Sequence, residues 1–125
     1  MKQLSRTGTT SRLQLAINNR TKNIFETEVI EAIDDILSTL GTSNKHAVYS
    51  LLENHYGLSK NEIPHKIEAF AYAIEQTFGL AAQLIEIKVM KKLHTKFKNV
   101  YTPIKAEANF CEFIFNLQTH LLTQV

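Results

Sequence analysis

The chain has 125 residues, a length that suits one domain. Hydrophobic residues make up 44% of it, enough for a packed core, whereas the absence of Trp and the low numbers of Gly and Pro argue against a turn-rich β-sandwich. The net charge is +2, and the single Cys111 excludes an intramolecular disulfide and is typical of a reducing compartment. Neither a secretory signal nor a run of roughly 20 apolar residues is present. We therefore expect a soluble, cytoplasmic protein.

The charges are distributed unevenly along the chain. Residues 1–23 carry five basic side chains and no acidic one: Lys2, Arg6, Arg12, Arg20 and Lys22. Residues 26–35 carry five acids and no base. The first twelve residues are also rich in Ser, Thr and Gly, a composition that buries too little surface to offset its ordering entropy. We expect residues 1–22 to form a flexible or extended basic leader and residues 23–125 to form a single helical domain; a nucleic-acid-binding arm is the alternative for the leader.

The first helix is expected to begin near Asn23 or Glu26 and to end at Leu40, where Gly41 follows. Acids in its first turns suit the helix dipole. Its apolar residues recur at helical spacing and define one face: Val29, Ile33, Ile36, Leu37 and Leu40.

A second helix follows almost at once. Thr42 or Ser43 is suited to cap its start, and Gly57 stands where a left-handed residue commonly ends a helix. Ser59 and Glu62 have the spacing of a capping box, which predicts one further helical turn.

The third and fourth helices are separated by a single glycine, Gly79. Pro64 suits the first turn of the third helix, because a proline lacks the N–H that this turn leaves unpaired. The fourth helix is expected from Leu80 to about Lys98. Its first half is apolar nearly all round, so we predict that this helix lies at the centre of the bundle.

Thr102 and Pro103 are suited to start a fifth helix that reaches nearly to Val125. The apolar arc of this helix is wide, and two accounts remain open for it: an interface with another chain, or burial within the bundle. The candidate interface residues are Phe110, Phe113, Phe115, Leu117 and Leu121. Together these patterns predict an all-α fold, a compact bundle of about five helices.

Catalytic and ligand-binding patterns are weak. The five histidines lack the spacing of a metal site, Cys111 lies in an apolar stripe, and no glycine is left for a phosphate-binding loop. Asp34 and Asp35 form the strongest carboxylate cluster, for which a solvated helix face is the better account. A small-ligand pocket lined by Phe70, Tyr72, Met90 and Phe110 is a third-ranked hypothesis. We expect no catalytic residue, no metal and no cofactor.

Lysines follow one side of the predicted fourth helix. Lys88, Lys92 and Lys96 recur every fourth residue, and Lys91 lies beside them. Such a ridge suits a phosphate backbone, and Arg6, Arg12 and Arg20 of the leader would extend it. Lysine ridges are also common on solvated helix faces, and no residue set for reading base edges accompanies this one.

Several short runs resemble a known family. They are HAVYSLLE (46–53), YGL (56–58), EIP (62–64), IEAF (67–70), FG (78–79) and LIE (84–86). Over about residues 29–98 the chain resembles a small uncharacterised archaeal helical family, described as a nitrosopumilus-type output domain and associated by genome context with signalling. The family commonly has a second Gly after the aromatic–Gly step, where this chain has Leu80 and Ala81, so a more rigid junction is expected. The resemblance implies an archaeal, cytoplasmic, non-catalytic module and transfers no catalytic residue.

The leading hypothesis is a non-catalytic helical interaction or signalling-output module that self-associates, through the last helix and the exposed part of the fourth. The expected partner is a second copy or another protein, with no membrane. The alternative is nucleic-acid binding through Lys88, Lys91, Lys92 and Lys96, assisted by the arginines of the leader.

Overall fold

The fold is described from a computed structural model, which covers residues 2–98 and 109–123; in the first half of α1 it describes the side chains of Leu13, Ala16 and the residues from Asn19 onward. The elements in chain order are α1 (Lys2–Ser38), α2 (Thr42–Tyr56), the short 3₁₀ helix η1 (Lys60–His65), α3 (Ile67–Phe78), α4 (Ala81–Phe97) and α5 (Phe110–Thr123). All of these elements are helical and pack against one another, so the predicted all-α bundle is confirmed.

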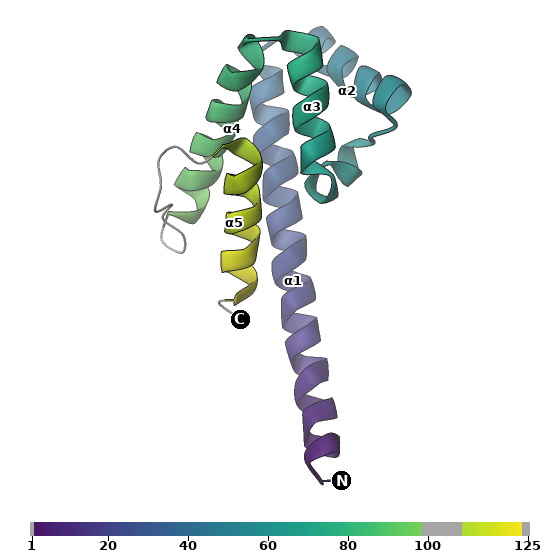
Figure 1. Ribbon diagram of the computed structural model, residues 1–125, viewed down its shortest axis with the longest axis vertical. Coiled ribbons are helices and arrows are strands. Elements are labelled where there is room, and N and C mark those ends of the chain that lie inside the picture. Colours follow the sequence, from purple (N-terminus) through teal and green to yellow (C-terminus); the bar gives the residue numbers. More distant parts are fainter. Residues whose placement is uncertain (1, 99–108, 124–125) are drawn as a thin grey trace.

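The long helix α1 is the axis of the bundle. Its second half contacts α2, η1, α4 and α5 (Figure 1). The residues that make these contacts form a helical stripe of almost fully buried side chains: Phe25, Val29, Ala32, Ile33 and Leu37. The first half of α1 extends away from the other helices (Figure 1). The bundle is therefore built around the C-terminal half of α1.

The basic leader belongs to α1. The helix begins at Lys2, so the expected start near Asn23 or Glu26 and the extended backbone expected before it are wrong. Residues 2–22 contain no proline and a single glycine. Once packing holds the second half of a helix, each residue added at its end gains a hydrogen bond without a new nucleation cost. Nothing in the leader therefore stops the helix before Lys2.

The local signals around α2 and η1 are largely confirmed. Gly57 adopts the left-handed conformation, with φ 63° and ψ 31°, and ends α2. Ser59 and Glu62 form the predicted capping box, in which the Ser59 N–H donates to Glu62 Oε1 at 3.0 Å. Two details differ. Gly41 stands at the cap position of α2, so Thr42 is already helical, and Pro64 lies inside η1 instead of starting α3.

The apolar residues of α3 recur at helical spacing and form its buried face. Ile67, Phe70, Ala71 and Ile74 are buried and Phe78 is half-buried. Gly79 then turns the chain into α4, with φ 60° and ψ −130°. These angles lie near those of the first central residue of a type II′ turn, a conformation that glycine adopts readily and residues with a Cβ avoid.

Substitution of Gly79 by alanine is expected to destabilise the fold by about 1–3 kcal/mol, the cost of a strained backbone. No atom lies within 4 Å of the position that an added Cβ would take, so steric overlap does not contribute. Gly57→Ala is the matched control, because its left-handed conformation is less restricted and it too has open space around it. Chemical denaturation would measure both. An equal or larger loss for Gly57→Ala would contradict this account of the turn.

The structure corrects the predicted position of α4. Only one side of its apolar first half is buried, through Ala82, Ile85 and Val89, whereas Leu80, Leu84 and Ile87 are exposed. Helix α4 therefore lies on the flank of α1 and does not form the centre of the bundle. A helix that is apolar all round gives no contrast between faces, and so its sequence does not reveal which side will be covered.

Helix α5 begins at Phe110, where the Asn109 side chain caps it: Asn109 Oδ1 accepts a hydrogen bond from the Glu112 N–H at 2.8 Å. The predicted start at Thr102 and Pro103 lies outside the described residues. Helix α5 packs against α1, α3 and α4 and completes the core (Figure 1).

Candidate interaction surface

The residues predicted to form an interface on α5 are mostly part of the core. Phe110, Phe113, Leu117 and Leu121 have at most 8% of their surface exposed, and the Phe110 ring lies 6.1 Å from that of Phe70. Of the two accounts left open for these four residues, burial within the bundle is the one that the structure fits. Phe115 is the exception, because 47% of its surface is exposed. The wide apolar arc of α5 is explained by contact with three other helices.

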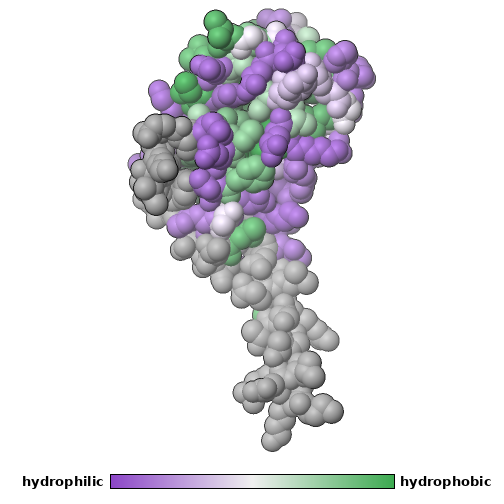
Figure 2. Space-filling model, viewed as in Figure 1, coloured by the Kyte–Doolittle hydropathy of each residue, from purple (hydrophilic) through white to green (hydrophobic). Residues whose placement is uncertain are grey.

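The exposed apolar surface lies instead on α4. Leu80 is 91% exposed, Leu84 56% and Ile87 42%. Their spacing of four and three residues places them on one side of the helix, opposite the buried Ala82 and Val89. We call these three residues the outer α4 face. Figure 2 shows hydrophobic residues on the surface at the end of the molecule where α3 turns into α4.

The basic and acidic segments of the sequence meet in the structure. Lys92 Nζ lies 3.2 Å from Asp35 Oδ2, and Lys96 Nζ lies 2.8 Å from Glu28 Oε2. The hydrogen bond with Glu28 raises the pKa of Lys96 above its ordinary value. Half of the predicted lysine ridge is thus paired with α1.

The other basic residues proposed for nucleic-acid binding do not form one cluster with Lys92 and Lys96. Lys88 and Lys91 are exposed beside the outer α4 face, and Arg20 is exposed on α1. The side chains of Arg6 and Arg12 lie outside the described residues. The geometry thus brings Lys88 and Lys91, but not Arg20, close to the exposed leucines of the same helix.

Asp34 joins three elements. Tyr49 Oη donates a hydrogen bond to Asp34 Oδ1 at 3.0 Å, and Lys60 Nζ lies 3.1 Å from the same oxygen. Lys45 Nζ lies 3.4 Å from Oδ2. Burial alone would raise the pKa of Asp34, but the bonds with Lys60 and Tyr49 outweigh it and lower that pKa. An ionised carboxylate with three partners ties α1 to α2 and η1, which is a structural role.

The predicted small-ligand pocket and an apolar groove lie in different parts of the bundle. Phe70 and Phe110 are buried and Met90 is half-buried, but Tyr72 is 58% exposed and its ring lies 6.3 Å from that of Tyr56. The predicted pocket of these residues is therefore not assembled. A shallow apolar groove of about 390 Å³ lies elsewhere, between the end of α1, α2 and the end of α3. Its lining residues include Leu40, Ala47, Val48, Leu51 and Phe78.

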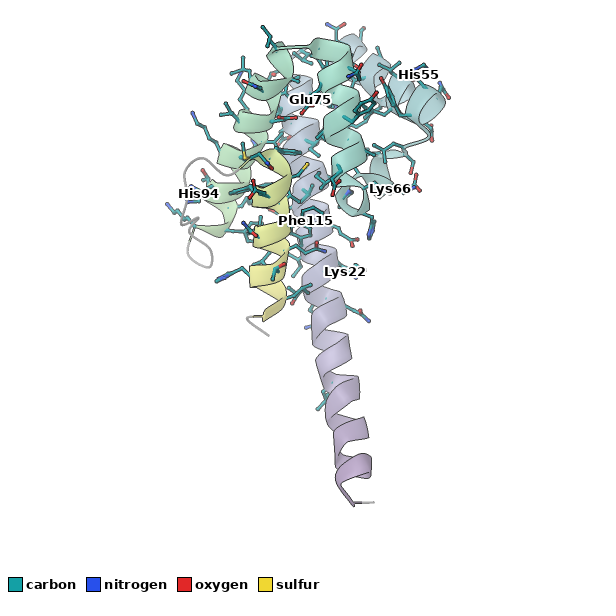
Figure 3. All side chains as sticks on the ribbon, viewed as in Figure 1. Lys22, His55, Lys66, Glu75, His94 and Phe115 are labelled. Carbon is teal, nitrogen blue, oxygen red and sulfur yellow. The ribbon has the colours of Figure 1, made fainter. Side chains whose placement is uncertain are left out.

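A buried carboxyl group on α4 was not anticipated. Glu86 is only 8% exposed, and its Oε2 atom is buried without a hydrogen-bond partner. Burial, and then the nearby Glu75 of α3, raise its pKa from 4.5 to about 7. Figure 3 shows Glu75 between α3 and α4. Register gives the one signal in the sequence: Glu86 follows the buried Ala82 by four residues and precedes Val89 by three.

Within residues 2–98 and 109–123, no three or more His, Cys, Asp or Glu side chains are grouped so that they could hold a metal ion. None of the helices in these ranges combines the length and the apolar character needed to span a bilayer.

Comparison with known proteins gives no relative: no protein-family model, curated protein or solved structure matches the chain. The resemblance of residues 29–98 to the archaeal output-domain family stays a prediction.

Proposed function

We propose that the protein is a non-catalytic helical interaction module that self-associates through the outer α4 face. The observation that carries this proposal is the exposure of Leu80, Leu84 and Ile87 on one side of a single helix. Contiguous exposed apolar residues rimmed by polar ones are typical of protein interfaces. Covering a fully exposed leucine or isoleucine side chain contributes about 1.5–3 kcal/mol, and this gain offsets part of the entropy cost of association.

A second copy of the chain fits this face. A two-fold axis through Leu84 would place Leu84 of one copy against Leu84 of the other, with the two α4 helices antiparallel. Leu80 lies four residues before this centre and Lys88 four residues after it, so each Leu80 would meet the partner's Lys88. The methylene stem of a lysine covers an apolar side chain while its ammonium group stays in water. The face is therefore complementary to itself.

The proposal is tested by the mass of the particle in solution. We expect the wild-type chain to form dimers at tens of micromolar, measured by light scattering on a sizing column. Leu84→Lys is expected to raise the dimer dissociation constant about 100-fold or more. Both copies carry the substitution, so the interface loses two leucine side chains and must bury two lysine charges. The variant should remain folded, since Leu84 is not in the core.

Phe115→Lys is the matched control, because it places the same charge on an exposed apolar residue of α5. It should leave the dimer intact. A wild-type chain that stays monomeric from micromolar to near-millimolar concentration would overturn the proposal. Dissociation by Phe115→Lys, with an intact dimer in Leu84→Lys, would move the interface to α5.

Nucleic-acid binding is the weaker alternative. Lys92 and Lys96, two of the four lysines proposed for it, are paired with acids of α1, which reduces the charge that a phosphate backbone would meet. The signalling-output role, the archaeal origin and the cytoplasmic location rest on the family resemblance, and the location also on the single cysteine. These three statements are part of the proposal, and each depends on the ground just named for it.

A further inference from the structure

A carboxyl group without a donor is present in the core. Glu86 lies on the buried side of α4, and its Oε2 atom has no hydrogen-bond partner. An ionised carboxylate that is removed from water needs several donors, and leaving it without them is costly. A protonated carboxyl group avoids this cost, because it is neutral and donates one hydrogen bond itself.

The group that Glu86 meets is a second carboxyl. Glu75 on α3 is near enough that it adds to the effect of burial and raises the pKa of Glu86 further. Two ionised carboxylates that lie close together repel each other, and a proton on Glu86 removes this repulsion. A proton on Glu86 therefore favours the packing of α3 on α4 at this point.

No cation is among the described groups that shift the pKa of Glu86. Cys111 of α5 lies near both glutamates, and Glu68 of α3 is a further acid beside it. Burial, and then these three acids, raise the pKa of the Cys111 thiol, so the thiol is neutral at neutral pH. On the side of α4 that faces α1, Asp35 is paired with Lys92 and Glu28 with Lys96.

We propose that the buried, unpartnered Glu86 is a proton-binding site in the junction of α3, α4 and α5, occupied in mildly acidic solution and empty above neutral pH. Loss of the proton leaves an ionised carboxylate without donors in this junction and weakens it. The site is independent of self-association, because Glu86 does not belong to the outer α4 face.

The direction of the pH dependence follows from linkage. The pKa of Glu86 is about 7 in the folded protein and 4.5 in its ordinary state, so the folded chain binds more protons between these values. Unfolding in this range releases a proton, and the free energy of unfolding falls as the pH rises. The stabilisation is fully present below 4.5 and is lost as the pH passes through about 7.

The first test is the titration of the wild-type protein, which requires no variant. Carboxyl carbon NMR of selectively labelled glutamate should show a group that titrates near neutral pH, and Glu86→Gln should remove it. The exposed Glu53 of α2 supplies the control variant Glu53→Gln, which should keep that titration. Titration of every glutamate in the usual acidic range would overturn the proposal.

The second test is stability against pH. Between about pH 5 and pH 8, the denaturation midpoint of the wild type should fall more steeply than that of Glu86→Gln, because the amide stays neutral while keeping the shape of the side chain. Unfolding near pH 6 should release close to one proton more from the wild type than from this variant. Parallel profiles for the wild type and Glu86→Gln would contradict a bound proton.

The reactivity of the Cys111 thiol provides a third readout, which responds to the charge of Glu86. Ionised Glu86 opposes formation of the Cys111 thiolate, so Glu86→Gln should lower the pKa of the thiol and increase its alkylation rate at alkaline pH. Glu53→Gln should leave that rate unchanged. If Glu86→Gln leaves the pH profile of alkylation unaltered, the two groups are not coupled as proposed.

Discussion

Replacement of Phe110 by alanine is expected to destabilise the folded monomer by about 3–5 kcal/mol, the usual cost of removing a buried aromatic side chain. Phe110 is 3% exposed, and its ring packs against Phe70 of α3 in the middle of the core. The loss is a large fraction of the 5–15 kcal/mol that stabilises a typical domain. Denaturation followed by circular dichroism would measure it.

Phe115→Ala is the control for this prediction. It makes the same chemical change on the same helix, but Phe115 is 47% exposed, so we expect a loss of less than about 1 kcal/mol. If both variants unfolded equally easily, the register of α5 described above would be wrong. If Phe110→Ala dissociated an assembly without lowering the stability of the monomer, α5 would be an interface after all.

Phe25→Ala is expected to have a similarly large effect, about 3–5 kcal/mol. Phe25 is 1% exposed and is the first residue of the buried stripe of α1. Its neighbour Ile24 is 52% exposed, and Ile24→Ala should cost less than about 1 kcal/mol. The pair tests whether α1 is the axis of the bundle, by the same denaturation measurement. A large loss for Ile24→Ala with a small one for Phe25→Ala would mean that α1 is rotated from the described position.

Local signals predicted a large part of the fold. Gly57 predicts the end of α2, and Gly79 predicts the end of α3. The capping box of Ser59 and Glu62 predicts η1, which connects the two helices. Each of these features depends on the backbone requirements of a few neighbouring residues, which are written in the sequence. The buried face of α3 was predictable too, because its apolar residues contrast with the polar ones.

Features that depend on tertiary packing were not predictable in the same way. Which side of α4 is covered depends on the surface that α1 and α3 offer, and its own apolar residues do not distinguish the sides. Likewise, the aromatic residues of α5 looked too numerous for one core face, but α5 packs against three helices. Burial is a property of the assembled bundle, so an apolar residue alone does not show whether it meets this chain or another.

The burial of Glu86 was not predicted, for a related reason. Glu86 stands among apolar residues, and an isolated acid in such a run is usually at the surface. Its environment depends on Glu75, which lies eleven positions earlier in the sequence and reaches α4 only after the turn at Gly79. Helical register identifies Glu86 as a residue of the buried side, whereas the carboxyl pair requires the packing of α3 on α4.

The length of α1 has a consequence for how the molecule moves through solution. Thirty-seven helical residues span about 55 Å, whereas a compact chain of this size would be about 36 Å across. Because the first half of α1 extends beyond the bundle, friction with the solvent is higher than for a sphere of equal mass. A single copy will therefore leave a sizing column early, at the volume of a heavier globular protein. Light scattering measures the mass of the particle independently of this friction, so it distinguishes an elongated monomer from a dimer.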